Sequence, residues 1–169
     1  LGLWAASPWI AYWISRPISR KSYPIAPKER QELRRLARRT WLFFETFVGP
    51  DDHWLPPDHF QEDPRGLVAH RTSPTNIGLL LLSTLAAYDF GYIGLMNLIL
   101  RLRSTLDGMD KLEQYRGHLL NWYDTRNLEP LPPRYVSAVD SGNLAGCLLS
   151  LQQGCLELEQ SPAFSWQRW

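Results

Sequence analysis

The stretch SPTNIGLLLLSTLAAYDFG, residues 73–91, decides the fold because it predicts a helix with almost no polar face. Ser73 is suited to cap this helix and Pro74 to occupy its first position. From Ile77 to Ala87 apolar residues lie on nearly every side, a pattern typical of a deeply buried helix. Gly78 would allow a neighbouring helix to approach closely.

In three further stretches the apolar residues recur at helical spacing. They run from about Lys28 to Phe47, from about Ile93 to Met109, and from about Gly142 to Leu158, the last capped by Asp140 or Ser141. His118–Tyr123 and Arg134–Val136 are predicted to pair as a small hairpin, since prolines exclude a helix between them. The predicted fold class is therefore all-α with a small β-hairpin insertion.

The N-terminal residues differ in composition from the rest. Residues 1–15 form an apolar segment without charge up to Ile14, too short to span a membrane, which needs about 20 apolar residues. The segment fits either a membrane edge or an ordinary core helix. Residues 16–27 form a basic, proline-containing linker, and residues 16–39 hold nine Lys and Arg against Glu29 and Glu32. Such a block favours the cytoplasmic surface of a membrane, and no motif indicates nucleic acid.

The cysteines and histidines predict no metal site and no cofactor. Cys147 and Cys155 lie eight positions apart on one predicted helix, about 12 Å along its axis, which is too far for a disulfide. We expect both to be reduced core residues. The four histidines show no ligand spacing.

The stretch from Gly117 to Gly146 is rich in polar and aromatic residues and lies between predicted helices. Trp and Tyr offer flat apolar faces, and Asp, Asn and Arg offer paired donors and acceptors, a combination that suits sugars. Its candidate substrate-binding residues are Asn121, Trp122, Tyr123, Asp124, Arg126, Asp140, Ser141 and Asn143. The alternative is a buried turn in which Asp124 caps its own backbone and Trp122 fills the core.

Residues 49–72 are predicted to form a long, ordered loop, because four prolines and five acidic residues exclude a helix through most of it. Asp58, Gln61 and Glu62 are candidate sugar contacts, and His70 and Arg71 could orient them. Alternatively, Asp58 and Glu62 pair with Arg65 and Arg71 and simply hold the loop closed.

Three segments in the same order resemble the middle region of bacterial cyclic β-1,2-glucan synthases. They are TWLFFETFVGPDDHWLPPDHFQEDP (40–64), VAHRTSPTNIGLLLLSTLAAYDFGYIG (68–94) and NWYDTRNLEPLPPRYVSAVDSGNLAG (121–146), and the match extends from about Leu33 to Leu158. One departure is Cys147, where the family pattern leads us to expect a polar residue such as His, so it is not counted as a contact.

The resemblance implies that residues 28–169 are the N-terminal part of a glucoamylase-like transglycosylase domain, an incomplete (α/α)6 barrel of helix pairs. That domain would cyclise linear β-1,2-glucan without metal or nucleotide. Its catalytic glutamates would belong to a later part of the domain, so this fragment alone should be inactive.

The resemblance also implies a membrane-embedded glycosyltransferase upstream, and therefore a location on the cytoplasmic face of the bacterial inner membrane. The expected partners are β-1,2-glucan, the remainder of the parent polypeptide and a membrane surface near residues 1–39. Two alternatives stay open: an endo-β-1,2-glucanase-like hydrolase, and a non-catalytic glucan-binding or membrane-adaptor module.

Overall fold

The structure, a computed structural model, describes residues 2–16 and 24–160 and divides into two compact units, Leu1–Leu33 and Arg34–Trp169. The first unit contains α1 (Gly2–Ile14) and the start of α2 (Pro27–Phe47). Aromatic side chains of α1 are largely exposed, with Trp9 at 76%, Tyr12 at 64% and Trp13 at 72%. Among the helices formed by the described residues, none is long and apolar enough to cross a membrane.

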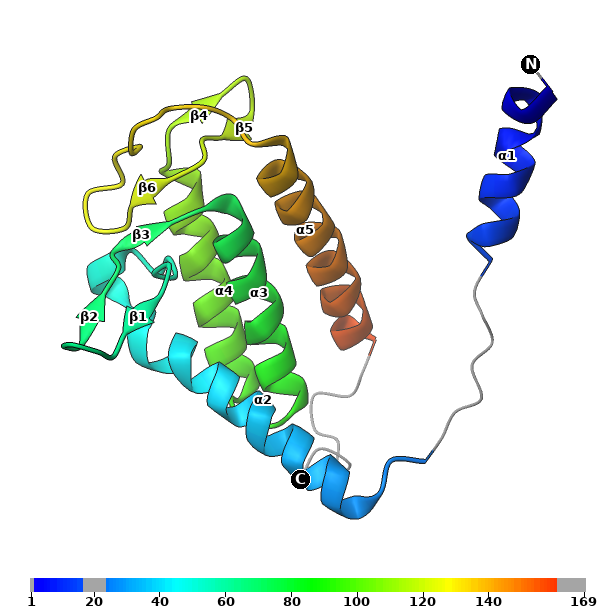
Figure 1. Cartoon of the computed structure of the whole chain (residues 1–169). Helices are drawn as coiled ribbons and strands as arrows, with labels where there is room; N and C mark the ends of the chain where they lie inside the picture. Colours follow the sequence, from blue (N-terminus) through cyan, green and yellow to red (C-terminus); the bar gives the residue numbers. More distant parts are fainter. Residues whose placement is uncertain (1, 17–23, 161–169) are drawn as a thin grey trace. The chain divides into compact units, whose positions relative to one another are not determined.

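The second unit is built from helices, which confirms the all-α fold class. After α2 come the short 3-10 helix η1 (Pro50–Asp52), then α3 (Pro74–Asp89), α4 (Leu95–Asp110) and α5 (Ala138–Glu159). α3 packs against both α4 and α5, and Figure 1 shows that α3 and α5 run in the same direction. Both start at the end of the helical layer where the strands gather, which we call the loop end.

Three antiparallel strand pairs lie at the loop end. They are β1 (Phe60–Gln61) with β2 (Leu67–Val68), β3 (Arg71–Thr72) with β6 (Tyr123–Asp124), and β4 (Gln114–Tyr115) with β5 (His118–Leu119). The long loop predicted for residues 49–72 therefore contains η1 and three short strands. It is ordered by burial of Leu55, Pro56 and Pro57 in its middle.

The predicted hairpin between His118–Tyr123 and Arg134–Val136 is wrong. Arg116 and Gly117 both have positive φ (52° and 81°), which makes a two-residue turn that folds β5 directly back onto β4. β6 pairs instead with β3. The 134–136 segment returns beside this region with a single backbone hydrogen bond, from Asn121 N–H to Tyr135 O (2.9 Å).

The predicted cap of the last helix is also wrong. Ser137 caps α5 with its side chain, which accepts a hydrogen bond from the backbone N–H of Asp140 (3.2 Å). Asp140 therefore lies inside the first turn, where its negative charge interacts favourably with the positive end of the helix. The Ser73 cap of α3 and the Pro74 position are confirmed, with Ser73 accepting from Asn76 N–H.

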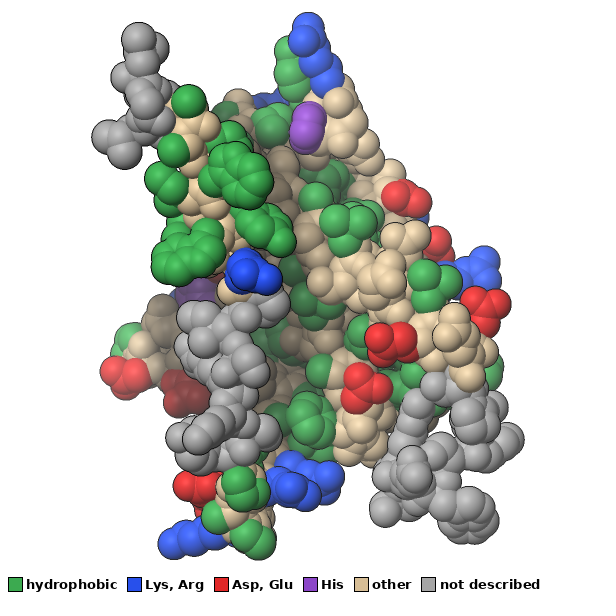
Figure 2. Space-filling model, turned by 90° about the vertical axis from the view of Figure 1, so that its right-hand side faces the viewer, with side chains coloured by type: hydrophobic (Ala, Val, Ile, Leu, Met, Phe, Trp, Pro, Cys, Tyr) green, Lys and Arg blue, Asp and Glu red, His purple; other side chains and the backbone are tan. Residues whose placement is uncertain are grey.

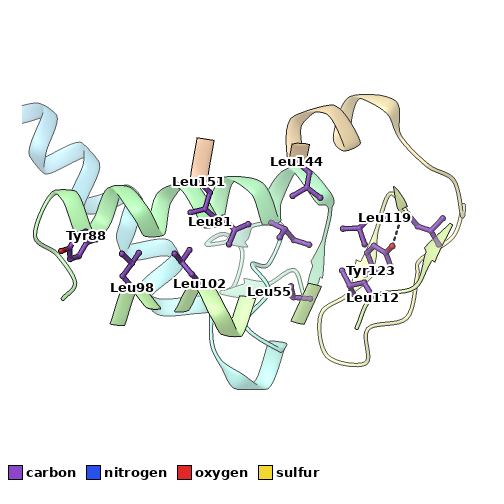
Figure 3. Close-up of a cluster of buried hydrophobic side chains, with 12 residues drawn as sticks. Leu55, Leu81, Tyr88, Leu98, Leu102, Leu112, Leu119, Tyr123, Leu144 and Leu151 are labelled. Atoms are coloured by element: carbon purple, nitrogen blue, oxygen red, sulfur yellow. Dashed lines mark hydrogen bonds between the residues drawn. The ribbon is translucent and has the colours of Figure 1, made fainter. Parts of the chain in front are cut away.

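The core has two parts, visible in Figure 3. Between the helices, α3 buries Ile77 and Leu81 against Leu98 and Leu102 of α4 and Leu144 and Leu151 of α5. Beneath the strands, Leu112, Leu119 and Leu120 surround the fully buried Tyr123. Each such leucine contributes about 1.5–3 kcal/mol by leaving water, so this packing dominates the stability of the unit.

Close helix contact depends on glycines, as predicted for Gly78. A Cβ there would lie 3.0 Å from the Cβ and Sγ of Cys147 on α5. Both cysteines are free, as predicted. Cys147 is half-buried, but the expectation that Cys155 lies in the core is wrong, because it lies on an exposed side of α5.

We predict that Gly108→Ala destabilises the protein by about 1–3 kcal/mol although alanine is the better helix former. The added Cβ would overlap the carbonyl oxygen of His53, a backbone atom that can move only if its loop moves. Gly146→Ala is the matched control, since its Cβ would meet nothing within 4 Å, and it should raise stability slightly. Urea unfolding of both variants tests this; equal stabilities would contradict it.

Candidate functional site

The pairing of β3 with β6 brings together the two sequence regions from which candidate residues were predicted. Arg71 lies opposite Asp124, and Thr72 lies opposite Tyr123. Because Ser73 caps α3 directly after β3, this pair is fixed at the loop end beside the start of the buried helix. The start of α5 lies at the same end (Figure 1).

Arg71 connects the two regions through its side chain. Its Nη2 and Nε donate to Oδ2 of Asp58 at 2.8 and 3.1 Å, and its guanidinium lies 5.1 Å from the centre of the Trp122 ring. Burial opposes ionisation of Asp58, but hydrogen bonds from Arg71 and His59 and the charge of Arg71 outweigh it, so the pKa of Asp58 lies below its usual value. Asp58 is therefore held as a carboxylate.

Asn121 is the centre of a second group of polar contacts. Its amide orientation follows from its partners, because the indole N–H of Trp122 can only donate and must face the amide oxygen. In that orientation the oxygen accepts from Trp122 Nε1 and from the Tyr135 hydroxyl, both at 2.8 Å. The amide nitrogen then donates to Oδ2 of Asp140 at 3.2 Å.

Asp140 links this group to the starts of α3 and α5. Its Oδ1 accepts from the Thr75 hydroxyl at 2.5 Å, and Asn143 donates to the same hydroxyl oxygen at 3.1 Å. Ser141 follows in the first turn of α5, where its backbone N–H donates to Ser137.

We call the connected set the loop-end cluster. It consists of Asp58, Arg71, Thr75, Asn121, Trp122, Tyr135, Asp140 and Asn143. The cluster combines a carboxylate, a guanidinium and amides in fixed orientations around an indole ring. Such a set can grip vicinal hydroxyls by paired hydrogen bonds and cover a sugar ring by apolar contact.

Asp124 and Arg126 form a local turn next to the cluster. Asp124 accepts from the backbone N–H of Arg126 (2.8 Å) and from its guanidinium (3.3 Å). Burial opposes ionisation of Asp124, but these contacts lower its pKa overall. Asp124 and Asp140 thus have separate partners, and the self-capping turn that the sequence left open is present.

Three other predicted residues lie around the cluster. Tyr123 is fully buried, and its hydroxyl donates to Glu113 O (2.6 Å) and accepts from Leu120 N–H (2.5 Å). Burial raises the pKa of Tyr123, so the hydroxyl stays protonated. Gln61 lies in β1, and Glu62 lines a separate open hollow of about 680 Å³ together with Asp58 and three phenylalanines of α2 and β1.

His70 belongs to a buried contact that sequence reasoning missed. Its Nδ1 lies 2.8 Å from Oδ1 of Asp52, and the Thr125 hydroxyl donates to the same oxygen. The Thr125 N–H donates to His70 O at 3.0 Å, while its own carbonyl bonds His53. Asp52, Thr125, Thr75 and Tyr135 carried no pattern that could single them out, since their partners lie 14 to 73 positions away.

Within residues 2–16 and 24–160, no group of three or more His, Cys, Asp or Glu side chains could hold a metal ion.

Comparison with known proteins supplies a relative and a structural neighbour; no protein-family model matches the chain. The chain is 49% identical over 162 residues to the cyclic β-(1,2)-glucan synthase NdvB of Rhizobium meliloti (strain 1021). This match covers 95% of the chain but only 6% of that protein. The resemblance to cyclic β-1,2-glucan synthases, predicted from three motifs, is confirmed.

A solved structure of a glucoamylase-like protein from Bacteroides fragilis NCTC 9343 has the same fold over this region. The TM-score is 0.64 at 19% identity, covering 82% of this chain and 33% of the other. The chain's helices therefore fit part of an α/α-barrel-like fold, as predicted.

We predict that Asp58→Asn makes the protein's stability less sensitive to acid. The folded-state pKa of Asp58 is lowered, so its contribution is complete above the ordinary value of 3.8 and is lost as the pH falls through the lower folded-state pKa. Without this titration, the free energy of unfolding should fall less steeply below pH 3.8.

Arg71→Met removes the arginine of the same ion pair. In this variant too, the free energy of unfolding should fall less steeply as the pH is lowered. Urea unfolding at a series of pH values measures both variants. If the free energy of unfolding of both variants falls as steeply with acid as that of the unmodified protein, the ion pair contributes no pH-dependent stability.

Proposed function

Because the chain is similar along nearly its whole length to a segment of a cyclic β-1,2-glucan synthase, we propose that it is the N-terminal part of such an enzyme's glucoamylase-like transglycosylase domain. In this proposal the loop-end cluster binds linear β-1,2-glucan, and the rest of the parent polypeptide supplies the catalytic glutamates and closes the (α/α)6 barrel. The complete domain cuts the glucan and joins its ends, without a cofactor.

The observation that carries this proposal is the loop-end cluster itself. Residues from the 49–72 loop, the 117–136 stretch and the first turns of α3 and α5 meet in one set of mutual contacts. The starts of two parallel helices add their positive dipole ends, which favour oxygen-rich ligands.

The acids of this region suit binding better than catalysis. Glycosidic bond cleavage needs a general acid whose pKa is raised, together with a second carboxylate close by. Asp58 and Asp124 have lowered pKa values, the opposite of that requirement, and each is paired with an arginine. Such carboxylates can accept hydrogen bonds from sugar hydroxyls, while carboxyl groups elsewhere in the parent polypeptide perform the proton transfer.

We predict that Arg71→Met in the complete protein weakens binding of linear β-1,2-glucan about tenfold, or 1.4 kcal/mol. The methionine keeps an apolar stem over Trp122 but removes the guanidinium that holds Asp58. Arg103→Met is the matched control, because Arg103 also faces an aspartate (Asp107, 3.9 Å) but on the exposed side of α4. Calorimetry with linear glucan measures the affinity, and melting temperatures verify folding.

The products distinguish the proposal from its alternatives. Cyclic glucan formed by the complete protein supports a synthase, whereas only shorter linear chains would indicate an endo-β-1,2-glucanase-like hydrolase. Binding without any product would indicate a non-catalytic module. Equal affinities of the Arg71→Met and Arg103→Met variants would refute a sugar site at the loop-end cluster.

We propose further that residues 1–39 lie at a membrane surface, on the cytoplasmic face of the bacterial inner membrane. The specific support is α1, on which Trp9, Tyr12 and Trp13 are exposed together. In Figure 2 the segment following the grey N-terminal residues is covered by hydrophobic side chains. Exposed Trp and Tyr beside a basic sequence are typical of membrane interfaces.

We predict that replacing Trp9 and Trp13 by serine lowers co-sedimentation of the 169-residue chain with anionic vesicles severalfold. The loss should follow from removal of two apolar anchors, and added salt should weaken the remaining binding. Phe90→Ser, an exposed aromatic residue after α3, is the control and should bind as the unmodified chain does. Equal sedimentation of all three proteins would contradict the proposal.

A further inference from the structure

A hollow of about 530 Å³ lies beside the loop-end cluster. One wall is the β4–β5 hairpin with its flanking residues, and the other is the 134–136 segment that returns towards α5. Its size is within the range of small-molecule sites, about 300–1,000 Å³. None of the candidate substrate-binding residues predicted from the sequence lines it.

Two tyrosines present their rings at this hollow. Tyr115 is 58% exposed and Tyr135 is 48% exposed, although both rings are large and mainly apolar. The Arg116 guanidinium lies 5.4 Å from the centre of the Tyr115 ring and steadies it, while Leu120 and Val136 complete an apolar lining. Flat aromatic faces that are left in water beside a hollow are suited to cover the C–H face of a sugar ring.

Polar groups accompany the rings. Glu113 and Arg134 form an ion pair whose two side chains are both about half exposed, and His118 also lines the hollow. The paired carboxylate and guanidinium leave further lone pairs and N–H groups for vicinal hydroxyls. Glu113 pairs with Arg134 and the Arg116 guanidinium lies over the Tyr115 ring, so the hollow combines donors and acceptors that suit a polyhydroxyl ligand.

The hollow and the loop-end cluster share one residue. Tyr135 lines the hollow with its ring, and its hydroxyl donates to the Asn121 amide oxygen at 2.8 Å. The Asn121 backbone N–H bonds Tyr135 O at 2.9 Å, which fixes the wall against the cluster. A chain of sugar units held at the cluster can therefore continue along Tyr135 into the hollow.

We propose that this hollow is a second glucan subsite, which binds a segment of the same β-1,2-glucan chain away from the units held by the loop-end cluster. This inference rests on the proposed function. It assigns Tyr115 and Tyr135 to substrate retention: the subsite holds a long chain while its reacting part is processed elsewhere. The subsite therefore contributes to KM for long glucan and leaves kcat unchanged.

The test uses the complete protein and linear β-1,2-glucan. Tyr115→Ala removes one stacking face from an exposed strand, and Val136→Phe narrows the hollow without removing a ring. We expect each to weaken glucan binding about fivefold to tenfold and to raise KM correspondingly at unchanged kcat. Phe90→Ala, which changes a similarly exposed aromatic residue at the opposite end of α3, is the control and should bind as the unmodified protein does.

The outcomes separate this inference from the proposed function. If Tyr115→Ala and Val136→Phe bind normally while Arg71→Met binds weakly, the hollow is no subsite but the cluster still is. If Tyr115→Ala does not fold, the glucan affinity of the Val136→Phe protein decides by itself whether the hollow is a subsite: normal affinity refutes the subsite and weakened affinity supports it. If the unmodified complete protein binds no β-1,2-glucan, both the inference and the proposed function are refuted.

Discussion

The whole second unit depends on the burial of α3, a helix without a continuous polar face. Ile77, Leu81 and Tyr88 can leave water only if neighbours cover more than one side, and α4 and α5 do so. Gly78 allows the close approach of α5 at Cys147, which brings the two helices together along parallel axes. Their starts then lie at one end of the layer, where the side chains of the loop-end cluster collect.

The fixed start of α3 also restricts the positions of β3 and of β6, which pairs with it. Thr72 is fully buried in β3 and Ser73 caps the helix, so the backbone between them has little freedom. β6 pairs with this short strand and is held further by the buried contact of Asp52 with His70 and Thr125. Arg71 and Trp122 are thus positioned by a rigid support rather than by mobile loops, as binding of a defined ligand requires.

Two hollows adjoin the loop-end cluster, and each is lined by a member of it. Asp58 lines the hollow formed with the phenylalanines of α2 and β1, and Tyr135 lines the hollow beside the β4–β5 hairpin. Asp58 and Glu113 each have an arginine as ion-pair partner, Arg71 and Arg134 respectively. An extended polymer, rather than a compact small molecule, matches this distribution of aromatic and polar groups.

The sequence by itself determined the helices, the Ser73 cap, the free cysteines and the family resemblance. These features depend on local periodicity, turn residues and motif order, which neighbouring residues alone express. Tertiary structure alone decided the pairing of β3 with β6 and the contacts of Asn121 with Tyr135 and Asp140, because those contacts join residues far apart in the chain. For the same reason Thr75, Thr125 and Tyr135 could not be singled out beforehand. A hydroxyl acquires its role from the group packed against it, and no spacing in the sequence records that neighbour.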